Sequence, residues 1–346
     1  MDQPASAPVM TDVARLAGVS HQTVSRVVNE SPHVSEATRA KVLAAMGELG
    51  YRRNAVARAL ATRRSGTLGV ITFDTVLHGP VSTLYSVEQA ASAVGLGVSI
   101  AVVDRIDSPA VVRALDRLQD QAVEGVVAIA PHQAALEALT AELRPVPTVF
   151  VGGVLPAGDD VALPPAVAID QHGGAEAATR YLLELGHRTV HHLAGPQDWM
   201  DASSRSAGWR ATLAAAGAWV PEPVTGDWSA RSGYAAMRRL LAADRSLTAV
   251  FAANDQMALG ALRALDEAGL RVPDDVSVVG FDDVPEAEFF RPPLTTVRQR
   301  FGEAGRRAVH LLLDLIRPED GRAGRVVPPA LVPTELLVRR SCGPAR

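Results

Sequence analysis

The first fifty residues carry hydrophobic positions at helical spacing. Val13, Leu16 and Ala17 fall on one face of a short segment. Thr11 stands where an N-cap belongs, and Gly18 follows as a C-terminal stop. We therefore predict a short helix that begins near Thr11 and ends at Gly18.

A second helix is predicted directly after a Gly-Val-Ser turn, with Ser20 as its N-cap. The positions that turn inward are Val24, Val27 and Val28, and those that turn outward are His21, Gln22, Ser25 and Arg26. A third helix, opened by Ser35, continues through Val42, Met46 and Leu49. Two short helices joined by a tight turn, with a hydrogen-bonding outer face on the second, are typical of a helix-turn-helix.

From Thr67 onward, short apolar runs alternate with helical stretches. The runs are TLGVITF, GVSIAVVD, EGVVAIA and PTVFVGG, and after a Pro- and Gly-rich connector at 155–165 they resume as AVAID, TVHHLAG, TAVFAAN and VSVVGFD. This alternation predicts βαβ units with parallel strands, so the fold class is α/β. We expect a second sheet to begin with AVAID, and one more helix over 301–316 to follow the connector at 291–294. Two such lobes are suited to closing around a small ligand at the strands' carboxyl ends.

Composition places the chain in a reducing compartment. Its 346 residues are 47% hydrophobic, enough for two or three domains. The single cysteine, Cys342, has no internal partner for a disulfide. Residues 1–9 lack the features of a signal peptide, and no apolar run is long enough to span a bilayer. A cytoplasmic protein without a membrane partner is the expectation.

Charge is unevenly distributed along the chain. Residues 1–64 carry nine Arg or Lys against five Asp or Glu, a net of +4, which leaves −8 for the remainder of a chain whose net charge is −4. A basic head on an acidic body indicates contact with nucleic acid at one end. Lys41 is the only lysine, which excludes a Schiff-base lysine and a GxxxxGK phosphate loop in the body.

The outer face of the second helix has the chemistry of a recognition helix. Gln22 can pair with adenine, Arg26 with guanine, and His21 with a base acceptor or a phosphate. The hydroxyl and amide side chains suited to positioning on phosphates are Ser20, Thr23, Ser25 and Asn29. The alternative on spacing alone is the solvated face of an ordinary three-helix bundle.

The stretch DVARLAGVSHQTVSRVVNESPHVSEATRAKVLAAMGELGYRRNAVARAL resembles the headpiece of the lactose/galactose (LacI/GalR) repressor family. The resemblance implies that His21, Gln22 and Arg26 read an operator, although His21 replaces a tyrosine found in the family. It also implies that 54–60 forms a hinge helix on DNA, with Leu60 wedged into the minor groove; a simple linker is the alternative. The residues expected at DNA are Thr11, Ser20, His21, Gln22, Thr23, Ser25, Arg26, Asn29, His33, Asn54, Ala57 and Leu60.

The rest of the chain resembles the periplasmic-binding-protein-like core of the same family, in the phrases LHGP, LAGPQDW, RSAGW, GDWSARSGY, FAANDQMALGALRAL, VSVVGFDD and PPLTTVRQRF. The domains implied are a headpiece at 1–52, a hinge helix and linker at 53–65, and an effector-binding domain at 66–341. Its N-lobe is expected at about 66–164 and 295–324, and its C-lobe at about 165–294 and 325–341. The residues expected at the effector are Leu77, Pro80, Arg105, Trp199, Asp201, Arg205, Trp228, Asn254, Asp282, Gln299 and Phe301.

The expected effector is a sugar. Trp228 offers a flat apolar face to ring C–H groups, while Arg205, Asn254 and Asp282 supply donors and acceptors for hydroxyls. Two polar residues of the family's cleft are replaced by Ile129 and Gly152, and Trp199 and Asp201 replace small hydroxyl residues. A galactoside is the first choice, and another mono- or disaccharide remains open.

Other readings have weaker support. Adjacent His191 and His192 point to opposite faces of a strand, so no metal site is expected, nor any cofactor. The chain lacks GxSxG and other catalytic motifs, so we do not expect an enzyme. The alternatives are a family member that uses a corepressor and a transport-type sugar-binding protein. The preferred interpretation is a homodimeric repressor on a pseudo-palindromic operator; the chain ends soon after Arg340, which favours a dimer over a tetramer.

Overall fold

The computed structural model describes residues 8–28, 31–51, 64–73, 76–103, 105, 107–142, 146–153, 165–317 and 330–345. The chain divides into two compact units, Met1–Ser65 and Gly66–Arg346. The second unit begins at the residue where the sequence places the start of the effector-binding domain. The predicted hinge positions Asn54, Ala57 and Leu60, and also Asn29, lie outside the described residues.

Unit 1 contains α1 (Met10–Ala17), α2 (His21–Val28) and α3 (Glu36–Leu49) among its described residues. Their core is formed by Val13, Ala14, Val24, Val27, Val28, Val42 and Ala45. The Ser20 hydroxyl accepts a hydrogen bond from the Thr23 N–H at 3.1 Å, and Ser35 caps α3 by accepting from the Thr38 N–H. The predicted caps of the second and third helices are therefore confirmed.

Two details of the first helix differ from the prediction. Its N-cap is Val9 rather than Thr11, because the Asp12 carboxylate accepts a hydrogen bond from the Val9 N–H at 3.0 Å and draws the helix start forward. Leu16 is 45% exposed, since Ala14 takes its place on the inward face. Gly18 does end the helix, with a left-handed φ of 66°.

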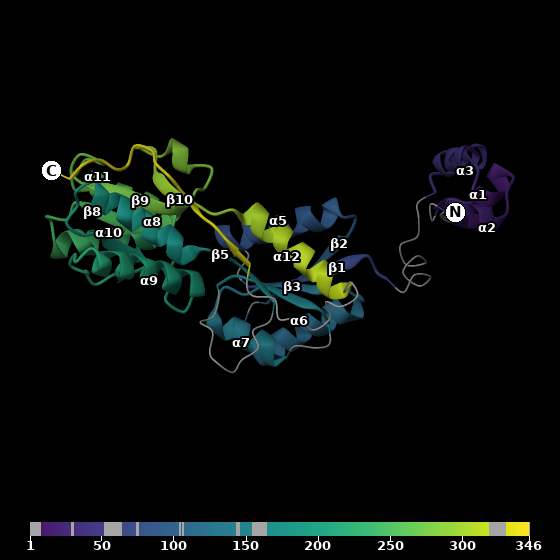
Figure 1. Ribbon diagram of the computed structural model, residues 1–346, viewed down its shortest axis with the longest axis horizontal. Helices are drawn as coiled ribbons and strands as arrows, with labels where there is room; N and C mark the ends of the chain where they lie inside the picture. Colours follow the sequence, from purple (N-terminus) through teal and green to yellow (C-terminus); the bar gives the residue numbers. More distant parts are fainter. Residues whose placement is uncertain are drawn as a thin grey trace, which may run out of the picture. The chain divides into compact units, whose positions relative to one another are not determined.

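Unit 2 has two sheets, each with six strands among the described residues. In the first, the order is β11 (Ala330–Val332), β5 (Ala166–Ile169), β4 (Thr148–Val151), β3 (Val126–Ile129), β1 (Thr67–Phe73) and β2 (Gly97–Val103). All of its pairings are parallel. One face packs on α5 (His78–Ala93) and α12 (Phe301–Ile316), and the other on α6 (Ser108–Asp120) and α7 (Gln133–Ala141) (Figure 1).

In the second sheet the order is β12 (Glu335–Leu337), β10 (Thr295–Arg298), β9 (Ser277–Asp282), β8 (Ala249–Ala252), β6 (His191–Ala194) and β7 (Val224–Thr225). Only β12 runs antiparallel to its neighbour among these described pairings. One face packs on α10 (Ala230–Ala243) and α11 (Asp255–Glu267), and the other on α8 (Gln171–Glu184) and α9 (Met200–Ala215). A short 3-10 helix, η1 (Ala287–Phe289), follows β9.

The lobe boundaries expected from the sequence are wrong in three places. AVAID forms β5 of the first sheet, because it pairs with β4 and does not open the second sheet. The strand at 295–298, assigned to the N-lobe, is β10 beside β9. Residues 330–332, assigned to the C-lobe, form β11 beside β5. The chain therefore passes between the sheets after β5, after β10 and after β11.

The two adjacent histidines of β6 point to opposite sides of the strand, as expected. His191 packs edge-on against Trp219, with ring centroids 6.0 Å apart. His192 is fully buried and stacks on Phe251 at 4.7 Å, and its Nδ1 donates to the Phe251 carbonyl at 2.9 Å. Burial lowers the pKa of His192 from 6.5 to about 4.

We predict that His192 makes the protein acid-sensitive. Its folded-state pKa lies below its unfolded value of 6.5, so its contribution is fully present above pH 6.5 and is lost as the pH falls toward about 4. The loss expected by pH 4.5 is about 2 to 3 kcal/mol. Urea denaturation at pH 7 and pH 4.5 should show a smaller loss for His192→Phe than for the unmodified protein. Equal losses would contradict this account.

Candidate functional site

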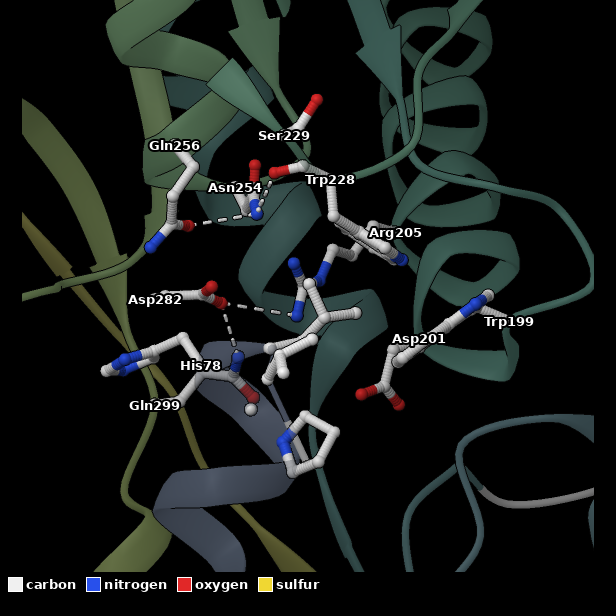
Figure 2. A pocket seen from close by; sticks show the side chains of 14 residues that line it. His78, Trp199, Asp201, Arg205, Trp228, Ser229, Asn254, Gln256, Asp282 and Gln299 are labelled. Atoms are coloured by element: carbon white, nitrogen blue, oxygen red, sulfur yellow. Dashed lines mark hydrogen bonds and ion pairs between the residues drawn. The ribbon is translucent and has the colours of Figure 1, made fainter. Parts of the chain in front are cut away.

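A cleft of about 170 Å³ opens between the two lobes of unit 2. Its lining residues, most of them drawn as sticks in Figure 2, come from the start of α5, from the starts of α9, α10 and α11, and from the ends of β9 and β10. They are Val76, Leu77, His78, Gly79, Pro80, Trp199, Asp201, Arg205, Trp228, Ser229, Asn254, Gln256, Asp282 and Gln299. The cleft therefore lies at the carboxyl ends of parallel strands, where α/β folds bind ligands.

A smaller cavity of about 40 Å³ adjoins this cleft. The two share Gly79, Pro80, Trp199, Asp201 and Gln299. The remaining lining residues of the small cavity are mainly apolar: Thr83, Ile129, Pro131, Val151, Gly152, Ile169, Gln171 and Phe301. The site as a whole has a polar part and an apolar part.

Four buried polar side chains form a hydrogen-bonded ring at the cleft. Arg205 Nε donates to Gln171 Oε1 at 2.8 Å, and Gln171 Nε2 donates to Gln299 Oε1 at 2.8 Å. Gln299 Nε2 donates to Asp282 Oδ1 at 2.6 Å, and an ion pair of 3.5 Å between Arg205 and Asp282 closes the ring. Each side chain is fixed by two others, so the ring is rigid and its geometry is preorganised.

Arg205 makes several polar contacts with other groups of the protein. Besides the ring, its Nη1 donates to the Ala253 carbonyl, and its guanidinium lies 3.9 Å over the ring of Phe281. Burial raises the pKa of Asp282, and the adjacent Arg205 opposes that rise. Asp282 also has a φ of 113°, a left-handed backbone that a non-glycine residue rarely adopts. Such strain is concentrated at functional sites.

Two indoles form one wall of the cleft. The rings of Trp199 and Trp228 meet edge to face with centroids 5.5 Å apart. Trp228 covers Gly195, where an added Cβ would come within 2.4 Å of the indole, so glycine is required there. The Asn254 side chain donates to the Trp228 carbonyl at 3.0 Å and caps α11 by accepting from the Met257 N–H at 2.8 Å.

The lobes touch directly at the far side of the cleft. The His132 ring of the N-lobe packs edge-on against Trp199 of the C-lobe, with centroids 4.5 Å apart. The Met200 N–H donates to the Pro131 carbonyl at 3.0 Å. An added Cβ at Gly153 would lie 2.3 Å from the Met200 Cβ, so the two segments approach as closely as glycine permits. The lobes of this structure are closed at this point.

In unit 1, the predicted DNA-reading side chains form an exposed surface. His21, Gln22 and Arg26 are all exposed on α2. The hydroxyls of Ser20 and Thr23 lie 2.9 Å apart. Thr11 and His33 are also exposed, on α1 and on the turn before α3. The outward face of α2 is thus free to contact another molecule.

Comparison with known proteins follows the same division. Residues 9–54 match the model of bacterial regulatory proteins of the lacI family, and residues 179–342 match a periplasmic binding protein-like domain. The lactose operon repressor of Escherichia coli is 38% identical over 93% of this chain and 88% of its own length. The regulator CelR of Thermobifida fusca is 38% identical over 96% of this chain and 98% of its own length. The ribose operon repressor of E. coli is 36% identical over 89% of this chain and 92% of its own length.

The chain belongs to the lacI family of bacterial regulatory proteins.

Solved structures of the family agree with the fold. The lac repressor dimer bound to operator and the anti-inducer ONPF superposes with a TM-score of 0.84 and 37% identity, covering 97% of this chain and 99% of that one. The complex of the regulator CelR with cellobiose superposes with a TM-score of 0.70 and 37% identity, covering 96% of this chain and 99% of that one. These relatives are transcriptional regulators rather than enzymes.

Within this lacI-family fold, the structure gathers almost all of the residues predicted for the effector. Those that line the cleft or the small cavity are Leu77, Pro80, Trp199, Asp201, Arg205, Trp228, Asn254, Asp282, Gln299 and Phe301. Arg105 does not join them, because its side chain is 75% exposed and pairs with Asp107 at 2.9 Å. Ile129 and Gly152 both line the small cavity.

Sequence reasoning missed several lining residues: His78, Ser229, Gln256 and Gln171. Gln171 carries a signal that could have found it, since it comes two residues after the apolar run 166–169 at the carboxyl end of a parallel strand. No helix within the described segments is long and apolar enough to cross a membrane. Those segments also contain no group of three or more side chains suited to a metal ion.

We predict that Gly153→Ala forces the lobes apart. The new Cβ would overlap Met200, which should cost about 1–3 kcal/mol in the free energy of unfolding measured in urea. In a Met200→Gly background the same substitution should cost much less, because the overlapping atom is gone. An equal cost in both backgrounds would place the strain elsewhere.

Proposed function

We propose that this protein is a transcriptional repressor that binds a pseudo-palindromic operator as a homodimer and leaves it when a saccharide inducer occupies the cleft. The observation that carries the proposal is the presence, in one chain of the lacI family, of an outward polar helix and a cleft lined by indole, amide and carboxylate side chains. Relatives named for lactose and ribose, and CelR solved with cellobiose, support the saccharide class and leave the individual sugar open.

The headpiece supports the DNA-binding half of this function. Gln22 and Arg26 lie one turn apart on the exposed side of α2, so both can reach base edges in the same major groove. Ser20 and Thr23 lie at the start of the helix, where hydroxyl and N–H groups suit phosphate oxygens. A pseudo-palindrome matches the two-fold symmetry of a dimer.

An exposed apolar face supports the homodimer. Val81 and Tyr85 of α5 are 41% and 65% exposed, and Ile100 and Val102 of the edge strand β2 are 45% and 51% exposed. Exposed apolar side chains on a helix and on the edge strand of the described sheet are typical of an interaction surface. A second copy of the chain that covers this face would bring two headpieces together in one dimer.

We predict that Arg26→Ala weakens binding to the preferred DNA site. A duplex enriched from a random pool by the full-length protein serves as the probe. Loss of one base-reading arginine should cost about 1–3 kcal/mol in a gel-shift titration and relax the preference at one base pair. Arg113→Ala, which removes an exposed arginine from α6, is the control and should bind normally. Failure to enrich any sequence, or equal weakening by both variants, would refute operator reading by α2.

We predict that Trp228 is required for sugar binding. Cellobiose, lactose and ribose are titrated while tryptophan emission is recorded, because Trp199 and Trp228 both line the cleft. Trp228→Ala should weaken binding of any responding sugar by about 1–3 kcal/mol, since it removes a buried aromatic wall. Trp219→Ala is the matched control, because Trp219 is 65% exposed and lines neither cavity. Unchanged affinity in Trp228→Ala would argue against this cleft as the sugar site.

A further inference from the structure

Asp201 is placed between the two parts of the site. It lies in the first turn of α9 and lines both the cleft and the small cavity. Figure 2 shows its carboxylate directed into the open space, and no dashed line reaches it. No hydrogen bond or ion pair is found for this carboxylate among the described residues, whereas each of the four buried side chains of the ring is bonded twice.

Three of the side chains around Asp201 that can donate hydrogen bonds already have protein acceptors. Arg205 donates to Gln171 and Ala253 and pairs with Asp282. The Gln299 amide N–H donates to Asp282 at 2.6 Å. The Asn254 amide donates to the Trp228 carbonyl and to Gln256 Oε1, both at 3.0 Å. These donors satisfy protein acceptors, so they are poorly placed to bind a phosphate or carboxylate of a ligand.

Acceptor capacity, by contrast, remains open. The Asp201 carboxylate is unpaired, and Asp282 has one oxygen outside the ring. Two carboxylates therefore face the cleft beside a single guanidinium, so the charged side chains of the cleft disfavour an anion. A ligand that brings hydroxyl donors would satisfy both carboxylates. Burial raises the pKa of Asp201, and hydroxyl donors would favour its charged form.

The small cavity limits the other end of the ligand. Its walls include Ile129, Val151 and Ile169. The Thr83 hydroxyl donates to the Gly79 carbonyl at 2.9 Å, and the Gln171 amide is bonded within the ring. Asp201 is thus the side-chain acceptor at this cavity for which no partner is found among the described residues. A carbon-rich part of the ligand fits there, with its nearest hydroxyl toward Asp201.

We propose that Asp201 sets the effector class: a neutral saccharide that donates hydroxyls to Asp201 and Asp282, places an apolar part in the small cavity, and is preferred over its phosphorylated form. This inference rests on the proposed function of the cleft as a saccharide site. It goes beyond that function because it names Asp201 as the specificity-determining residue and excludes anionic effectors.

The test is calorimetric titration of the full-length protein with matched pairs of probes. The pairs are cellobiose with cellobiose 6-phosphate, lactose with lactose 6-phosphate, and ribose with ribose 5-phosphate. We expect at least one neutral sugar to bind, and to bind about tenfold or more tightly than its phosphorylated partner. Asp201→Asn should weaken the binding of that sugar about tenfold or more, as expected when a charged acceptor is lost. It should also reduce the ratio between the affinities for the neutral and the phosphorylated sugar.

The controls separate this role from a structural one. Asp120→Asn changes an exposed carboxylate at the end of α6 in the same way and should leave both affinities unchanged. Asp201→Ser, which keeps a small acceptor, gives a second variant, and thermal unfolding of each protein checks that it is folded. Tighter binding of a phosphorylated probe, no binding of any neutral probe, or full affinity in both Asp201 variants would overturn the proposal.

The same proteins are tested for binding to the enriched DNA site. If DNA binding persists while Asp201 proves irrelevant, the inference about the effector fails and the repressor function stands. If sugar binding depends on Asp201 but no DNA sequence is selected, the proposed repressor function fails and the inference stands.

Discussion

The ring formed by Arg205, Gln171, Gln299 and Asp282 joins the segments in which the chain passes between its lobes. Gln171 follows the first passage, after β5, and Gln299 lies in the second, after β10. The third passage is bonded to the first, because the Asp170 N–H donates to the Val332 carbonyl at 2.8 Å and the Thr334 hydroxyl donates to the Asp170 carbonyl at 3.3 Å. The hinge of this domain is therefore also a wall of its cleft.

This arrangement gives a physical route from ligand to lobe geometry. A saccharide that bonds to Asp282 contacts the ring that fixes both passages, and one that packs on Trp199 contacts the segment bonded to Pro131 of the opposite lobe. A ligand shifts an equilibrium only when it interacts differently with the two states. The Trp199 contact joins the two lobes, so a ligand on Trp199 interacts differently with two arrangements of the lobes.

Much of the fold follows from the sequence, because short apolar runs bounded by turns specify strands locally. TLGVITF gives β1 at Thr67–Phe73 and the last helical pattern gives α12 at Phe301–Ile316. Which sheet a strand joins is decided by pairing with distant residues, and this is why the lobe of β5 was wrongly predicted. Strands of three or four residues such as β10 and β11 carry too little pattern to be assigned.

The residues of the cleft were predictable as a group, but their chemistry was not. Arg205 and Asn254 were expected to bind hydroxyls, and the structure shows their donors bonded to the protein, since Arg205 closes the ring and the Asn254 amide donates to the Trp228 carbonyl. Gln171, which consumes one donor of Arg205, is 34 positions away in sequence, so spacing cannot reveal the pair. Conversely, the free carboxylate of Asp201 points to a ligand only once the structure shows that the neighbouring donors are bonded to other protein groups.

The central claim is that binding of the sugar in the cleft and binding of the operator by the headpieces are energetically coupled. Linkage requires that a sugar which lowers operator affinity by some factor loses affinity for the protein by the same factor when operator is bound. Measuring the dissociation constant of the sugar with and without saturating operator tests this directly. The account predicts a decrease in sugar affinity of about 5- to 150-fold. Identical sugar affinities for the free and DNA-bound protein would contradict it.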